Sequence, residues 1–193
     1  MNDLSWFPLK VLNNKKNGVY VELGSSHPIN GNNTYTLETQ YDWTGLSIDI
    51  EEKMCDEFNN IRKNKSICAD ALTFNYLKHF EENNFPKQID YLQVDVDEGY
   101  TLGGRARGNP ASSLLALISL PLNQYRFSII MFEHDELIDY KFNSIKNAQR
   151  EILYSLGYSL VQQYPSEDWW IDPTVIPYSE YKKYFMARQN DHN

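Results

Sequence analysis

The sequence has few cysteines, no long apolar run and fewer basic than acidic residues, and each shortage excludes a class of protein. Its two cysteines, Cys55 and Cys68, lack the number and the C-x-x-C spacing of a zinc site or a disulfide scaffold, so we expect two buried or half-buried free thiols. No run of about 18 apolar residues occurs, so no membrane-spanning segment is expected. The 18 basic residues against 26 acidic ones give a formal net charge of −8, which disfavours nucleic acid as a partner.

What is present suits a packed globular protein. The 193 residues are 41% hydrophobic and 14% aromatic, enough for a single domain with its own core. We expect this domain to span 1–193, with 1–17 as an N-terminal extension and 188–193 as a polar tail. The first ten residues lack the basic start and apolar centre of a signal peptide, so a cytoplasmic location is expected; the sequence indicates no oligomeric state.

Short apolar runs alternate with helix-like stretches, which is typical of a mostly parallel sheet covered by helices. The sequence therefore predicts an α/β, Rossmann-like fold with helices on both faces of the sheet. Strands are expected at 18–24, 45–49, 66–68, 89–95, 126–132, 158–163 and 169–171, and helices at 34–41, 51–62, 70–80, 112–120 and 144–156.

Four acidic residues stand at or just beyond the ends of four successive apolar runs: Glu22, Asp49, Asp70 and Asp95. The carboxyl ends of parallel strands lie on one edge of the sheet, where ligands of such folds bind. Gathered carboxylates repel one another, so they indicate a ligand rich in hydrogen-bond donors. Asp49 ends the second run, the position expected for an acid that binds a ribose.

The first turn separates two cofactors. A dinucleotide site requires G-x-G-x-x-G for its pyrophosphate, whereas this turn has Glu22 two residues before Gly24 and no second closely spaced glycine. An acid there opposes a pyrophosphate and suits the ammonium group of a methionine moiety. The turn favours S-adenosylmethionine and leaves an NAD-linked oxidoreductase as an alternative.

Several stretches of the chain, from about residue 18 to 172, resemble FkbM-type methyltransferases. They are Val19–Gly24 (VYVELG), Gly31–Glu38 (GNNTYTLE), Trp43–Asp49 (WTGLSID), Asp90–Val96 (DYLQVDV), Arg126–His134 (RFSIIMFEH) and Arg150–Tyr158 (REILYSLGY). The N-T-x-x-L-E and W-T-G-L motifs behind the E-x-G turn carry most of the resemblance. Two departures occur: Ser26, His27 and Pro28 stand where the family often has an acid and a glycine, and Asp95–Tyr100 (DVDEGY) replaces D-V-E-G-A-E.

The resemblance implies a class I fold with a seven-stranded sheet and an S-adenosylmethionine-dependent O-methyltransferase. It places Glu22 near the methionine end, Asp49 at the ribose, and Asp70 with Ala71 at the adenine. The further cofactor-binding residues that it implies are Gly24, Ser25, Asn33 and Thr34.

Catalytic candidates follow the two central runs. Methyl transfer requires an aligned and deprotonated oxygen, so we expect Asp95 or His134 as the base and Glu133 as an orienting group. Asp95, Asp97 and Glu133 could instead gather a Mg²⁺ ion, which prefers oxygen ligands.

The loop 103–110 carries Arg105 and Arg107, which we expect to contact a carboxylate or phosphate on the acceptor. The expected reaction is methyl transfer to a hydroxyl of a sugar, glycan or other small molecule. The altered block after Asp95 leaves a second alternative, a module of the same fold that binds the cofactor without catalysis.

Overall fold

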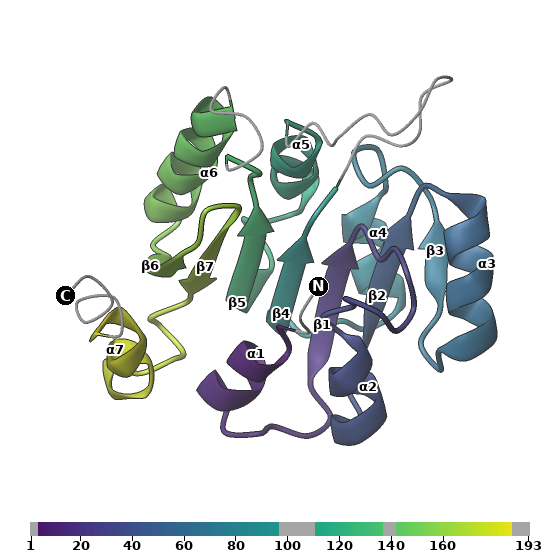
Figure 1. Ribbon diagram of the computed structural model, residues 1–193, viewed down its shortest axis with the longest axis horizontal. Coiled ribbons are helices and arrows are strands. Elements are labelled where there is room, and N and C mark those ends of the chain that lie inside the picture. The colour runs from purple at the N-terminus through teal and green to yellow at the C-terminus, as the bar shows by residue number, and fades with distance from the viewer. Residues whose placement is uncertain (1–3, 97–110, 137–141, 187–193) are drawn as a thin grey trace.

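A seven-stranded sheet forms the centre of the structure, a computed structural model that describes residues 4–96, 111–136 and 142–186 (Figure 1). The strand order is β3-β2-β1-β4-β5-β7-β6, and only β7 runs antiparallel to its neighbours. The strands are β1 (Val19–Leu23), β2 (Thr44–Asp49), β3 (Ser66–Cys68), β4 (Gln88–Val94), β5 (Arg126–Glu133), β6 (Ser159–Gln163) and β7 (Glu167–Ile171). This architecture confirms the predicted α/β fold with its mostly parallel sheet.

The two central strands explain why the sheet can be covered on both sides. All residues from Ile89 to Val94 in β4 and from Phe127 to Phe132 in β5 are buried. A strand that is buried on both faces needs mostly apolar sequence rather than alternation. In β5 only Ser128 interrupts the apolar run, whereas β4 also buries Asp90 and Gln93.

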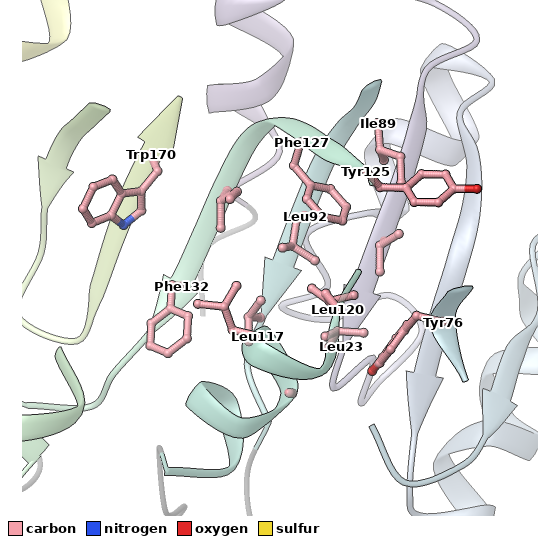
Figure 2. Close-up of a cluster of buried hydrophobic side chains, with 14 of the residues drawn as sticks. Leu23, Tyr76, Ile89, Leu92, Leu117, Leu120, Tyr125, Phe127, Phe132 and Trp170 are labelled. Carbon is pink, nitrogen blue, oxygen red and sulfur yellow. The ribbon is translucent and has the colours of Figure 1, made fainter. Parts of the chain in front are cut away.

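Helices form a layer on each face of the sheet (Figure 1). One layer consists of α4 (Tyr76–Glu82), α5 (Ala111–Ser119) and α6 (Asn143–Ser155); the other consists of α1 (Trp6–Val11), α2 (Tyr35–Tyr41) and α7 (Tyr178–Met186). The remaining helix, α3 (Glu52–Ile61), packs along β2 and β3. Figure 2 shows the first apolar core, in which Leu117 of α5 and Tyr76 of α4 belong to one cluster with strand residues such as Leu92 and Phe132.

The structure differs from the sequence prediction at three helices. The helix expected from Asp70 begins only at Tyr76, because the Asp70 carboxylate accepts a hydrogen bond from Leu72 N (2.9 Å) and holds a turn, while Asn75 caps the helix. Neither α1 nor α7 was predicted. Phe7 of α1 is fully buried, so part of the expected N-terminal extension belongs to the second core. Among the described residues, no helix is both long and apolar enough to cross a membrane.

Candidate functional site

The carboxyl ends of the central strands form a row of residues at one edge of the sheet. Leu23 pairs with Ile48 on one side and with Val94 on the other, and Val94 pairs with Phe132. In each of the four strands, the next residue along the chain therefore lies beside the corresponding residue of the adjacent strand. The row, read from β2 to β5, is therefore Asp49, Gly24, Asp95 and Glu133. Strands are about 4.8 Å apart, so the row brings the predicted acids close together.

Gly24 makes the close approach in the middle of this row possible. Its φ is +84°, and a Cβ atom added there would lie 1.7 Å from the backbone oxygen of Asp95. Gly24 N and Ser25 N both donate to Ile48 O, at 2.9 and 3.0 Å. Only glycine fits this turn, which is the physical reason for the glycine in the E-x-G pattern. Ser25 is buried, and its hydroxyl lies 2.9 Å from that of Ser66, so this side chain faces the interior.

Asp49 is oriented by the backbone around it. One carboxylate oxygen accepts from Ser26 N at 2.7 Å and the other from Glu51 N at 2.9 Å. Each oxygen keeps a further lone pair, so the half-buried carboxylate can still accept two hydroxyl groups.

Asp70 lies two residues beyond Cys68, which pairs with Asp49. One of its carboxylate oxygens accepts a hydrogen bond from Leu72 N, and the side chain is half-buried. Ala71 is buried beside it, with its carbonyl accepting from the Tyr76 hydroxyl at 2.6 Å. The structure thus places Asp49, Asp70 and Ala71 along the adjoining ends of β2 and β3.

Glu22 differs from the expectation. Its carboxylate is 2% exposed and accepts hydrogen bonds from Asn32 Nδ2 (3.1 Å), Thr34 Oγ1 (3.0 Å) and Ser47 Oγ (2.9 Å). Burial raises the pKa of Glu22 to about 7, although the charge of Arg62 opposes the rise. This side chain faces the protein interior and holds the turn, and its contact with the methionine end of a cofactor stays a prediction.

Asn33 and Thr34 also hold the turn rather than line the edge. Asn33 Oδ1 accepts from Leu4 N at 3.0 Å, which ties the segment before α1 to the turn. Thr34 is fully buried between Glu22 and Arg62. Both residues support the turn in this structure, and their direct contacts with a cofactor stay predictions.

Arg62 was not among the residues predicted from the sequence, and it supports this turn from the interior of the protein. Its guanidinium has no exposed surface and donates to Pro28 O (3.0 Å), Asn32 Oδ1 (2.9 Å) and Thr34 Oγ1 (3.1 Å). It also pairs with the buried Glu38, with Nε 3.2 Å from Oε1. The acid of the N-T-x-x-L-E motif was the available signal, because a buried glutamate requires a buried cation.

Asp95 and Glu133 form the second half of the row. Both are half-buried, and their side chains are hydrogen-bonded to each other. Burial, and then the charge of Asp95, raise the pKa of Glu133 well above its ordinary value. Glu167 of β7 is the strand partner of Glu133 in β5, and burial raises the pKa of Glu167 too. The pair therefore holds a proton at neutral pH, and it combines a proton acceptor with a proton donor.

His134 does not join this pair. Its ring is fully buried, with Nδ1 accepting from Glu136 N (3.3 Å) and Nε2 3.8 Å from Asp168 Oδ1. Asp168 is held in turn by Arg150 and Gln149. A base has to reach its substrate, so the structure argues against His134 as the base and leaves Asp95.

Three predicted residues, Asp97, Arg105 and Arg107, lie outside the described residues. Within the described part of the chain, no group of three or more His, Cys, Asp or Glu side chains is placed to hold a metal ion. Of the three residues predicted to bind Mg²⁺, the structure therefore describes only Asp95 and Glu133.

A hollow of about 260 Å³ lies at the opposite edge of the sheet, where Val19 and Thr44 begin their strands. Its other lining residues include Asn64, Asn83 and Phe85. It lies away from the acidic row, and in open α/β sheets ligands bind at the carboxyl ends, so we assign the candidate site to the row.

No protein-family model and no curated protein matches this sequence. Solved structures do match its fold. Human methyltransferase-like protein 13, in complex with SAH, matches at 13% identity over 98% of this chain and 91% of that one, with a TM-score of 0.58. A Clostridium thermocellum protein assigned as an rRNA-methylase matches at 14% identity, over 88% and 96%, with a TM-score of 0.55. A Streptococcus mutans protein assigned as a methyltransferase, in complex with SAH, matches at 14% identity over the same shares, with a TM-score of 0.53. The chain thus has the Rossmann-like class I methyltransferase fold.

Proposed function

We propose that this chain, built on that fold, is an S-adenosylmethionine-dependent methyltransferase that methylates a hydroxyl group of a sugar or other small molecule. The observation that carries the proposal is the row at the carboxyl edge, with an oriented Asp49 next to the close turn at Gly24 and the Asp95–Glu133 pair beyond it.

Asp49 and Asp70 fit the nucleoside of this cofactor. A ribose diol donates two hydrogen bonds, and Asp49 offers one spare lone pair on each of two fixed oxygens. Asp70, with Ala71, would hold the adenine. When bound, the sulfonium supplies an electrophilic methyl group.

Topology supports this cofactor over NAD. The dinucleotide-binding sheet has six parallel strands in the order 3-2-1-4-5-6, whereas this sheet inserts the antiparallel β7 between β5 and β6. The turn after β1 also lacks the glycines that bring backbone amides to a pyrophosphate.

Asp95 is the proposed base. In-line displacement requires an oxygen nucleophile that is aligned and loses its proton, and this proton passes to the Asp95 carboxylate. Glu133, which keeps its proton, donates a hydrogen bond that orients Asp95 or the acceptor oxygen. With Glu167 also nearby, the carboxyl groups disfavour a phosphate and suit a neutral hydroxylated acceptor.

The test is release of SAH from S-adenosylmethionine with a panel of sugars, polyols and phenols, measured for the wild type and for Asp95→Asn. We expect the wild type to release SAH with at least one hydroxylated acceptor, and we expect Asp95→Asn to lose this turnover. Cofactor binding without turnover on any acceptor would instead favour the module that binds without catalysis. Turnover limited to nucleic acid or amine acceptors contradicts the O-methyl assignment.

A further inference from the structure

The two cysteines meet beside the end of β2, although they belong to different elements. Cys55 lies in α3, and Cys68 is the last residue of β3, level with Asp49. Cys55 Sγ lies 3.5 Å from Asp49 O, and Cys68 Sγ lies 3.8 Å from Ile50 O, so the thiols approach consecutive carbonyl groups. Cys68 is also close enough to Cys55 to raise the pKa of its thiol, so the two side chains are neighbours. Both cysteines are free thiols, as expected, but Cys68 is exposed rather than buried or half-buried.

The two thiols differ in access. Cys55 is 2% exposed, whereas Cys68 is exposed to solvent. Burial, together with the neighbouring Cys68, raises the pKa of the Cys55 thiol above its ordinary value. An oxidant therefore reaches and oxidises Cys68 first, while Cys55 is protected until its neighbour has reacted.

We propose that Cys55 and Cys68 are a site of reversible oxidation, at which a peroxide closes an intrachain disulfide that weakens nucleoside binding at Asp49. The peroxide oxidises the Cys68 thiol to a sulfenic acid and leaves as water. The Cys55 sulfur then attacks the Cys68 sulfur, the S–O bond breaks and a second water leaves with the Cys55 proton. Two thiols lose two electrons in total, and one peroxide gains them.

The disulfide acts on the backbone that presents Asp49. In the reduced protein the thiols are donors to the carbonyl groups of Asp49 and Ile50, and the next residue, Glu51, orients the Asp49 carboxylate through its N–H. A disulfide removes both S–H donors and joins α3 to the end of β3. The predicted effect on binding rests on the proposed function, whereas formation of the bond does not.

The experiment treats the full-length protein with hydrogen peroxide and then follows two readouts. Intact-mass spectrometry and peptide mapping without reduction detect the bond, and titration calorimetry measures SAH binding before oxidation, after it and after dithiothreitol. We expect a loss of about 2 Da per chain, a linked Cys55–Cys68 peptide, and a Kd for SAH that rises about tenfold and recovers on reduction. Cys68→Ser, a change at an exposed position, and Cys55→Ser are the matched controls. Neither can form the bond, so each should keep its SAH affinity after peroxide.

Absence of the linked peptide in folded wild-type protein overturns the proposal, and so does an unchanged SAH affinity in the fully linked protein. A reduced wild type that does not bind SAH at all contradicts the proposed function instead. In that case the peptide map still decides whether the oxidation site exists.

Discussion

Replacing Glu22 with glutamine should remove a pH dependence of stability that originates in one buried carboxyl group. In the folded protein burial raises the pKa of Glu22 from 4.5 to about 7. As the pH rises between these values, the unfolded chain loses this proton before the folded protein does. The contribution of Glu22 to stability is therefore fully present below about pH 4.5 and is lost as the pH rises through about 7.

The size of the effect follows from that shift. About 2.5 pKa units at 1.36 kcal/mol each correspond to about 3 kcal/mol of unfolding free energy. Glutamine keeps the shape of the side chain, and its amide oxygen can still accept from Thr34 and Ser47. Its NH2 group cannot accept from Asn32, which adds a cost that does not depend on pH, and glutamine does not titrate. The stability of Glu22→Gln relative to the wild type should therefore rise by about 3 kcal/mol between about pH 4 and about pH 8.5.

Urea denaturation of both proteins across this range, monitored by circular dichroism, provides the measurement. Glu82→Gln is the matched control, because Glu82 is an exposed acid on α4 whose ion pair with Lys78 lies at the surface. Its profile should run parallel to that of the wild type. A Glu22→Gln profile that is also parallel to the wild type would show that Glu22 does not titrate as a buried group.

Three further predictions concern the row and its support. Gly24→Ala should destabilise the protein by about 3 kcal/mol or more in urea denaturation, because a Cβ at a φ of +84° meets the Asp95 carbonyl; unchanged stability would contradict the close turn. Arg62→Met should cost about 3–5 kcal/mol by leaving Glu38 buried without its cation, and Arg62→Lys should recover part of it; equal stability of the two variants would refute the ion pair as the cause. Asp95→Asn should lower the rate of methyl transfer by about 100-fold or more while SAH affinity stays within about twofold, and loss of both together would point to a structural role.

The sheet was predictable because its signals are local. A continuous apolar run identified β5 and a mostly apolar run identified β4. An acid at or just beyond the end of each successive run identified the edge where they meet. The position of Asp70 beyond β3 was predictable for the same reason. The start of the following helix was not, because a hydrogen bond from Leu72 N to the Asp70 carboxylate holds a turn there and α4 begins only at Tyr76.

The support of the site was less predictable because it depends on contacts between distant parts of the chain. Sequence spacing does not reveal whether an acid two residues before a glycine faces a ligand or the interior. At Glu22, the partners Thr34, Ser47 and Arg62 come from three other segments and turn the carboxylate inward. The meeting of Cys55 with Cys68 depends in the same way on how α3 packs against β3.

The most direct test of the central claim is calorimetric titration of the wild type and of Asp49→Asn with SAH and, separately, with NAD⁺. If the carboxyl edge binds an adenosine with a methionine-derived tail, the wild type binds SAH and not NAD⁺. Asp49→Asn should then weaken SAH binding by about 10- to 100-fold, since hydrogen bonds to a charged acceptor contribute about 1.5–3 kcal/mol. A folded wild type that does not bind SAH, or an Asp49→Asn variant that binds it equally well, would contradict the assignment of this edge.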